Sequence, residues 1–493
     1  MLASLGVALD DVLYGGLLGL GIIFGWCFRR IKHPTKKKWI STVLGFLLVF
    51  AVSGYHVLRP LIVTTVNAFL ITICGKKYSH ILSFILSFGF LTFFRFSDYF
   101  GAPYAPGPVN LINMVLTMRM VGLAFESRDS WLSHKTESKM ATSGAKLSEM
   151  EEKEPFDVHP GFVDVFHYAF CYVGVLTGPY YRYNTYRDMI DTPFAKYAPC
   201  WDATLSRLLL LPFTVTVFVI VNGLFPNKMA LTDEFYSNRS VLYRIIFLSI
   251  SFFNFRMRIY TGVMLSECVC TMAGLGAYPD WCKPRYGMGP TCRWQEVARL
   301  GRSPIQAMRE KYNFDTVHSV NIWKCEFEPT VRQSMKSWNM TIQYWLAAYV
   351  YKRFPIKSLR TTATMFMSAF WHGAHAGYYL CIMSVPPHLV VEDLYVKLFL
   401  NNAGPKLRKF LNFMLWFMRM QGFSYMSITF QLLTIEAALR YWGSIYYCYH
   451  WILGALYIAG LVVQFRRPKK AVPAASVTHD FHAIDPPKIN KTE

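Results

Sequence analysis

Residues 362–385 read TATMFMSAFWHGAHAGYYLCIMSV, an apolar run that contains no Asp, Glu, Lys or Arg. A transmembrane helix needs about 20 predominantly apolar residues, and this run is long enough. Two histidines, His372 and His375, lie in its middle. Ionisable side chains are costly to bury at membrane depth, so the pair predicts a functional site inside a membrane protein.

The whole chain has the composition of a helical membrane protein. Of its 493 residues, 53% are hydrophobic and only 16% are charged, against about 25% charged in soluble domains. Apolar runs recur from residue 11 to residue 465. We therefore predict an all-α polytopic membrane protein with about eleven transmembrane helices, and with re-entrant or interfacial helices where the runs are short. This composition excludes a disordered chain and a small disulfide-bonded scaffold.

The basic residues predict the orientation of the chain. The formal net charge is +21, and Lys and Arg gather at the ends of apolar runs, where they face anionic lipid headgroups. The clusters at 29–38 and 466–470 are expected in the cytosol, which places the amino terminus in the lumen and the carboxyl terminus in the cytosol. No nucleic-acid motif accompanies the charge, so nucleic acid is not an expected partner. The oligomeric state cannot be predicted from these patterns.

We expect residues 1–465 to form a single membrane-embedded domain, followed by a polar, disordered cytosolic tail at 466–493. Two polar inserts interrupt the apolar pattern. Residues 126–160 are expected to form a flexible loop. The insert 277–337 carries a predicted amphipathic helix at about 294–312. The cysteines lack the paired spacing of a zinc site, so no metal is expected.

Histidines and amides on apolar segments predict the candidate catalytic residues. The imidazole of His372 suits proton transfer at neutral pH, and His375 is expected to matter less. In SWNMTIQYWL (337–346), Asn339 and Gln343 are four residues apart and are expected on one helix face, where an amide N–H can stabilise an oxyanion. Local sequence leaves an alternative open, in which the histidine is buried and only hydrogen-bonds to a neighbouring helix.

These two segments carry a resemblance to a known family. WNMTIQYWL followed about thirty residues later by SAFWHGAHAGYY resembles the membrane-bound O-acyltransferase family, and most of all its lysophosphatidylinositol acyltransferase branch. The segments 110–126, 168–186, 255–279 and 439–450 resemble the same branch. The similarity covers most of the chain between about 85 and 450, and it does not extend to residues 128–157 or to the tail.

The resemblance implies a helical fold around a central catalytic chamber in the endoplasmic reticulum membrane. It implies transfer of a fatty acyl group from acyl-CoA, a co-substrate, to the free hydroxyl of a lysophospholipid, without any cofactor. His372 becomes the catalytic histidine and Asn339 its partner. The branch implies lysophosphatidylinositol as the acceptor and a polyunsaturated donor such as arachidonoyl-CoA.

The substrates' anionic groups need cationic and hydroxyl partners. The candidate substrate-binding residues are Arg182, Tyr183, Arg256, Arg258, Tyr260, Trp338, Gln343 and His375. Arg and Tyr are also common at membrane interfaces, and that explanation of these residues stays open.

Three other functions also stay open. The acceptor of the same enzyme class could be a lysophospholipid with a choline, serine or ethanolamine headgroup, or it could be a sterol or a protein. A transporter or channel would also place polar residues in membrane helices. Acyl-CoA consumption separates the enzymes from the transporter.

Overall fold

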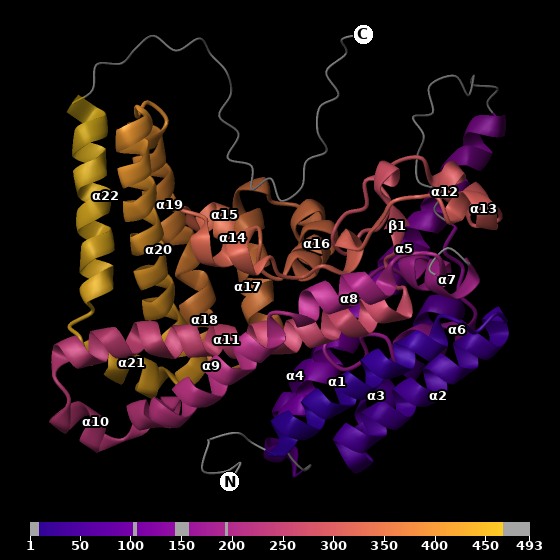
Figure 1. Ribbon diagram of the computed structural model, residues 1–493, viewed down its shortest axis with the longest axis horizontal. Helices are drawn as coiled ribbons and strands as arrows, with labels where there is room; N and C mark the ends of the chain where they lie inside the picture. Colours follow the sequence, from indigo (N-terminus) through magenta and orange to yellow (C-terminus); the bar gives the residue numbers. More distant parts are fainter. Residues whose placement is uncertain (1–8, 102–105, 143–156, 193–195, 467–493) are drawn as a thin grey trace. The chain divides into compact units, whose positions relative to one another are not determined.

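The computed structural model describes residues 9–101, 106–142, 157–192 and 196–466, and it is helical almost throughout (Figure 1). Among the described residues there is one small antiparallel sheet, in which β1 (Tyr278–Pro279) pairs with β2 (Tyr312–Asn313). The all-α class predicted from the sequence is confirmed.

The chain divides into two compact units, which we describe separately. The first unit comprises residues 1–219, 257–319 and 340–345. Its helices are α1 (Leu9–Phe28), α2 (Pro34–Ser53), α3 (Leu58–Thr72), α4 (Ser79–Arg95), α5 (Gly107–Thr142), α6 (Phe162–Ala169), α7 (Tyr183–Asp191), α8 (Cys200–Leu208), α12 (Trp294–Leu300) and α13 (Pro304–Ala307). It also holds the 3₁₀ turns Gly54–Val57, Ser97–Phe100, Asp280–Cys282 and Asp315–Val317.

The second unit comprises residues 220–256, 320–339 and 346–493. Its helices are α10 (Asp233–Asn238), α14 (Ile322–Phe327), α15 (Val331–Met335), α17 (Arg360–His372), α18 (Ala376–Met383), α19 (Val385–Tyr395, with a π-helical turn at Val396–Leu400), α20 (Pro405–Leu432), α21 (Ile435–Ser444) and α22 (Cys448–Arg466). The 3₁₀ turns are Asn227–Leu231, Tyr351–Arg353 and Lys357–Leu359. The residues of α9 (Leu211–Leu224), α11 (Val241–Ala273) and α16 (Met340–Tyr349) are shared between the two units.

Five helical segments among the described residues are long and apolar enough to cross a bilayer, by length and composition. They are Asp10–Phe28, Pro34–Thr72, Gly107–Thr136, Cys200–Leu231 and Cys448–Arg466. These segments support a multi-pass membrane protein. The count of about eleven crossings and the single domain at 1–465 stay predictions.

Helix α5 corrects the expectation of a loop beginning at residue 126. The helix continues from Gly107 to Thr142, and its 36 residues correspond to roughly 54 Å at 1.5 Å per residue. That length exceeds a hydrocarbon core of about 30 Å. The polar residues beyond 126 include good helix formers such as Glu and Lys, and the helix they follow is already nucleated, so they extend it. Residues 143–156 of the predicted loop lie outside the described residues, as does the tail beyond 466.

The amphipathic helix expected at 294–312 is also corrected. The helix α12 ends at Leu300, α13 covers only Pro304–Ala307, and Tyr312 belongs to β2. Pro304 has no N–H for a continuing helix, and its ring disfavours a helical backbone at the preceding residue. The predicted pattern is therefore split where Pro304 begins a new turn.

Candidate active site

The sequence WHGAHAG at 371–377, called here the WHGAHAG motif, lies at a break between two helices of the second unit. Helix α17 ends at His372 and α18 begins at Ala376. His372 is half-buried, whereas His375 is exposed. Non-helical backbone at membrane depth is tolerated where it is buried in protein or lines a water-filled space. The break thus places His372 at the end of α17 and His375 directly before α18, on backbone that is not part of a continuous helix.

Aromatic rings surround the His372 imidazole. Its ring centroid lies 4.9 Å from that of Trp371, 5.1 Å from that of Phe430 and 6.0 Å from that of Tyr378. The rings of Tyr378 and Phe430 are themselves 4.6 Å apart. Contacts from α17, α18 and α20 thus restrict the orientation of the imidazole, as a group that moves a proton at a defined position requires.

Gly377, which follows the two histidines, lies so close to the end of α20 that there is no room for a side chain. The N–H of Gly377 donates to the carbonyl of Leu433 at 2.7 Å, and the Thr429 hydroxyl donates to the Gly377 carbonyl at 3.1 Å. A methyl group on Gly377 would overlap the carbonyl oxygen of Thr429. The absence of a side chain at Gly377 therefore allows α18 to approach the end of α20 closely.

Asn339 lies directly before α16, in a left-handed backbone conformation with φ 49° and ψ 44°. Asn is among the few residues other than Gly that adopt this conformation readily. Its side chain makes no capping hydrogen bond to the helix. The expectation that Asn339 and Gln343 share a helix face is wrong, because the helix begins at Met340 and only Gln343 belongs to it.

A buried arginine of α20 forms hydrogen bonds to the segment 320–339, which ends at Asn339. The Nη1 atom of Arg419 donates to the Cys325 carbonyl and to the Ser334 hydroxyl, both at 2.9 Å, and Nη2 donates to the Glu326 carbonyl at 2.9 Å. Arg419 is 1% exposed. Helix α20 therefore holds both the WHGAHAG motif, near its carboxyl end, and the segment 320–339.

Glu392 of α19 holds the same segment from a second helix. Its carboxylate accepts the N–H groups of Val331 and Arg332, at 2.5 and 3.2 Å, at the start of α15. Neither Arg419 nor Glu392 is among the residues predicted from the sequence. Both are ionisable residues within apolar runs, and that signal could have identified them.

Two of the predicted substrate-binding arginines are paired with carboxylates of the protein. Arg256 makes two hydrogen bonds to Glu326, from Nε at 2.7 Å and from Nη2 at 3.1 Å, and it is buried. Arg258 is exposed and bonds to Asp11 at 2.9 Å. The pairs do not test a role in substrate binding, which stays a prediction.

Arg182 and Tyr183 lie beside a buried carboxylate of α5. The Nε atom of Arg182 is 3.7 Å from Oε1 of Glu126, and both side chains are 3% exposed. The N–H of Tyr183 donates to Oε2 of Glu126 at 3.2 Å, and the Tyr180 hydroxyl donates to Oε1 at 3.3 Å. The protein thus supplies an internal counter-charge to Arg182. The sequence does not predict this pair, because Glu126 ends an apolar run far from Arg182 in the chain.

The candidate residues are divided between the two units. His372, His375, Asn339, Trp338 and Arg256 belong to the second unit. Arg182, Tyr183, Arg258, Tyr260 and Gln343 belong to the first unit, where Tyr260 is fully buried on α11. Trp338 and Gln343 are half-buried.

Comparison with known proteins assigns the family. The model of the membrane-bound O-acyltransferase family matches residues 109–436, which include both His372 and Asn339. The chain belongs to the membrane-bound O-acyltransferase family. The family resemblance predicted from the two motifs is thereby confirmed, and this membrane-bound O-acyltransferase carries its candidate catalytic residues inside the matched region.

Relatives of this membrane-bound O-acyltransferase are similar over nearly their full length. It is 39% identical over 449 residues to the Drosophila melanogaster membrane-bound acylglycerophosphatidylinositol O-acyltransferase frj, with 90% of each chain covered. It is 33% identical to the Homo sapiens membrane-bound acylglycerophosphatidylinositol O-acyltransferase MBOAT7, with 95% of this chain and 97% of the human protein covered. The Danio rerio protein of the same name is 32% identical, with 90% and 91% covered.

Proposed function

We propose that this protein transfers a fatty acyl group from acyl-CoA to the free hydroxyl of lysophosphatidylinositol. The observation that carries the proposal is similarity over at least nine-tenths of the chain to proteins named acylglycerophosphatidylinositol O-acyltransferases. Two further observations support the proposal: aromatic rings surround His372, and hydrogen bonds to Arg419 and Glu392 hold the segment before Asn339 in place. A polyunsaturated donor such as arachidonoyl-CoA is part of the proposal and rests on the branch resemblance alone.

His372 acts as the general base in the proposed reaction. A lysolipid hydroxyl is a weak nucleophile at neutral pH, so its proton passes to the imidazole as the oxygen attacks the thioester carbonyl. An ester C–O bond forms, the C–S bond breaks, and the coenzyme A sulfur leaves with the proton that the imidazole returns. Direct transfer between two bound substrates needs no acyl-enzyme intermediate.

Asn339 has the complementary role. Its side chain makes no capping hydrogen bond to α16, and we assign its amide N–H to a substrate. An amide donor aimed at the thioester oxygen stabilises the negative charge that develops there. Alternatively it positions the acceptor hydroxyl, and both roles require the segment 320–339 to be held in place.

The test uses the purified full-length protein with labelled arachidonoyl-CoA and a panel of lysophospholipids of matched chain length in mixed micelles. We expect acyl-CoA to be consumed fastest with lysophosphatidylinositol. Equal or faster use of lysophosphatidylcholine rejects the headgroup assignment and leaves the enzyme class intact. Movement of a lysolipid across liposome membranes without acyl-CoA consumption rejects the enzyme class in favour of a transporter.

The proposed location is the endoplasmic reticulum membrane, with the amino terminus in the lumen and the carboxyl terminus in the cytosol. The basic clusters at 29–38 and 466–470 support this orientation. Protease treatment of sealed microsomes should remove a carboxyl-terminal tag and spare an amino-terminal one. A protected carboxyl-terminal tag contradicts the orientation.

A further inference from the structure

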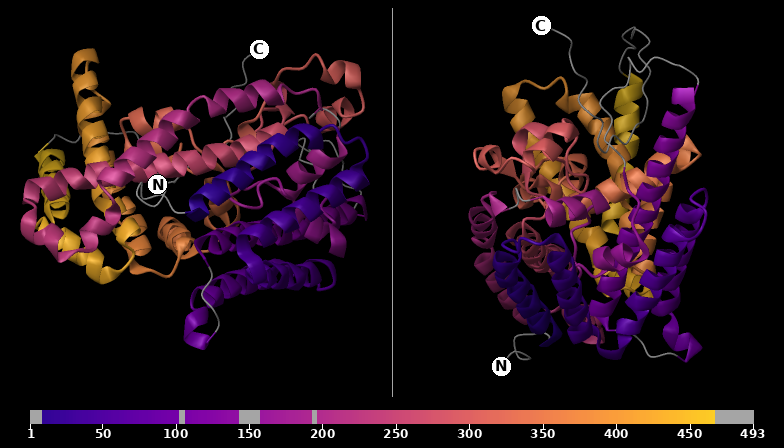
Figure 2. Two further views of the ribbon diagram at one scale, coloured as in Figure 1. Left: turned by 60° about the horizontal axis from the view of Figure 1, so that its bottom comes forward. Right: turned by 90° about the vertical axis from the view of Figure 1, so that its right-hand side faces the viewer.

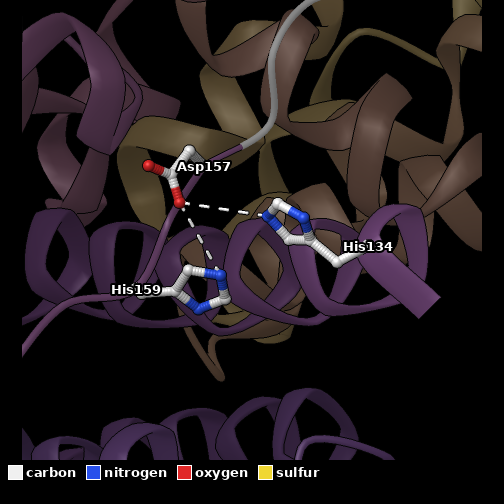
Figure 3. A group of neighbouring side chains, drawn as sticks. All are labelled: His134, Asp157 and His159. Atoms are coloured by element: carbon white, nitrogen blue, oxygen red, sulfur yellow. Dashed lines mark ion pairs between the residues drawn. The ribbon is translucent and has the colours of Figure 1, made fainter. Parts of the chain in front are cut away.

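Three metal-binding side chains meet at the polar end of α5, in a part of the first unit that has no place in the proposed reaction. His134 comes from α5, and Asp157 and His159 come from the chain that leads to α6 (Figure 3). The Nε2 atom of His134 is 4.0 Å from Oδ1 of Asp157, and that of His159 is 3.7 Å from the same oxygen. The carboxylate therefore lies between the two imidazoles.

The backbone under these side chains is held against α5. Val158 is fully buried, and its N–H donates to the Ser130 hydroxyl at 3.1 Å. The Nη1 atom of Arg187 donates to the Asp157 carbonyl at 2.8 Å. The two flanking side chains, Asp157 and His159, remain 68% and 48% exposed, and His134 is 53% exposed. A fixed backbone thus presents three potential metal ligands at the surface, and the Nε2 atom of His159 also lies 3.4 Å from the Ser130 hydroxyl.

We infer that His134, Asp157 and His159 form a binding site for a divalent transition metal, with Zn²⁺ as the preferred ion. Two imidazole nitrogens and one carboxylate oxygen are a ligand set that Zn²⁺ takes readily, with solvent completing the coordination. One potential ligand atom from each residue lies within 4.8 Å of the other two. Bond lengths of about 2.0–2.2 Å put tetrahedral ligand atoms roughly 3.3 Å apart. Small rotations of these exposed side chains would bring the ligand atoms from the distances in the structure to this separation.

A simpler interpretation is that the histidines, when protonated, only pair with Asp157. Exposed ion pairs contribute little to stability, about 0–1 kcal/mol. The ion-pair interpretation requires positive charge on the imidazoles, whereas a metal requires their neutral form. The two interpretations therefore predict opposite results in a metal titration at neutral pH.

The experiment measures Zn²⁺ binding to the full-length protein in detergent, purified without a polyhistidine tag, by competition with a chromophoric chelator. We expect one equivalent to bind. His134→Ala and His159→Ala should each weaken that binding at least tenfold. Asp157→Asn, which keeps the size of the side chain, should weaken it less. His33→Ala is the matched control, because His33 is an exposed histidine of the same unit, and it should bind like the wild type.

Two results overturn the inference. One is Zn²⁺ binding by His134→Ala and His159→Ala that equals wild type. The other is a thiolate-to-metal charge-transfer band on substitution with Co²⁺, which assigns the ion to cysteines. Acyl-transfer activity of the variants serves as the check that they are folded, since none of the three residues belongs to the proposed catalytic machinery.

Discussion

The N–H of Gly377 donates to the carbonyl of Leu433, and this bond joins the histidine motif to the end of α20. Leu433 itself has φ 68° and ψ −52°, a backbone conformation that is strained for a residue with a side chain. The N–H of Thr434 closes this tight turn on the carbonyl of Leu432 at 2.8 Å. Helix α18 and the turn after α20 thus fix the backbone that follows His372 and His375. Figure 2 shows the helical ribbon from two further directions.

Replacement of Gly377 by Ala should abolish most acyl transfer. The added methyl group would overlap the Thr429 carbonyl and lie 2.8 Å from that of Leu433, so the backbone must move. Overpacking of this kind costs typically 1–3 kcal/mol. Turnover and thermal stability of the purified variant are the measurements. Gly454→Ala in α22 is the control, because nothing lies within 4 Å of the added group. Equal activity of the two variants would contradict the prediction.

His372→Ala should retain the fold and lose turnover by about 10²–10⁴-fold, the usual contribution of general base catalysis. His375→Ala should be milder, because His375 is exposed and its ring contacts only one of the rings around His372 in the described structure, that of Tyr378. The rate at saturating substrates and the melting temperature are measured together. A His372→Ala protein that keeps more than half of the wild-type rate would remove this residue from the mechanism.

The sequence proposes His372 and Asn339 as catalytic candidates, but it does not predict the structure that surrounds them. The run at 362–385 predicts an apolar segment with two imidazoles, because polarity is a local property of the sequence. In the structure this run is divided between α17 and α18, and it is not among the five described segments long enough to cross a bilayer as one helix. The sequence does not reveal that the helix breaks between His372 and Ala376, since this geometry depends on the contact of Gly377 with α20.

Other contacts in the structure could not be predicted from the sequence, because they join residues that are far apart in the chain. Glu126 and Arg182 are brought together only by the fold, as are His134 and His159. The polar stretch after residue 126 has the composition of a loop, yet it continues α5 to Thr142. Composition alone cannot distinguish a solvated helix that extends a buried one from an irregular loop.

Two variants of Asn339 should separate its backbone role from its amide role. Asn339→Gly keeps the left-handed conformation and removes the amide, so we expect normal stability and a loss of turnover of about 10²–10³-fold, as for loss of one oxyanion donor. Asn339→Asp keeps the shape and removes the N–H donor, and it should be equally impaired. Near-normal turnover of the Gly variant would show that the residue serves the backbone alone.

Arg419→Met should lower both stability and turnover. The change leaves the carbonyls of Cys325 and Glu326 and the hydroxyl of Ser334 without their cationic donor, and hydrogen bonds to charged groups contribute about 1.5–3 kcal/mol each. The segment before Asn339 would then be less firmly held. Arg408→Met on the same helix is the control, since Arg408 is exposed. Thermal unfolding that is the same in both variants would contradict the role of Arg419.

The pair of Arg182 and Glu126 allows a test that separates support of the fold from recognition of the lysolipid. Arg182→Ala leaves a carboxylate buried without its cation, and breaking a buried pair in this way costs about 3–5 kcal/mol. We expect the second change Glu126→Gln to restore much of the lost thermal stability, because the buried charge is then gone. The Michaelis constants of the doubly changed protein for lysophosphatidylinositol and for acyl-CoA complete the test. A constant for lysophosphatidylinositol that stays raised about tenfold or more in the restabilised protein assigns Arg182 to the headgroup. Recovery of that constant along with stability shows instead that Arg182 acts by neutralising Glu126.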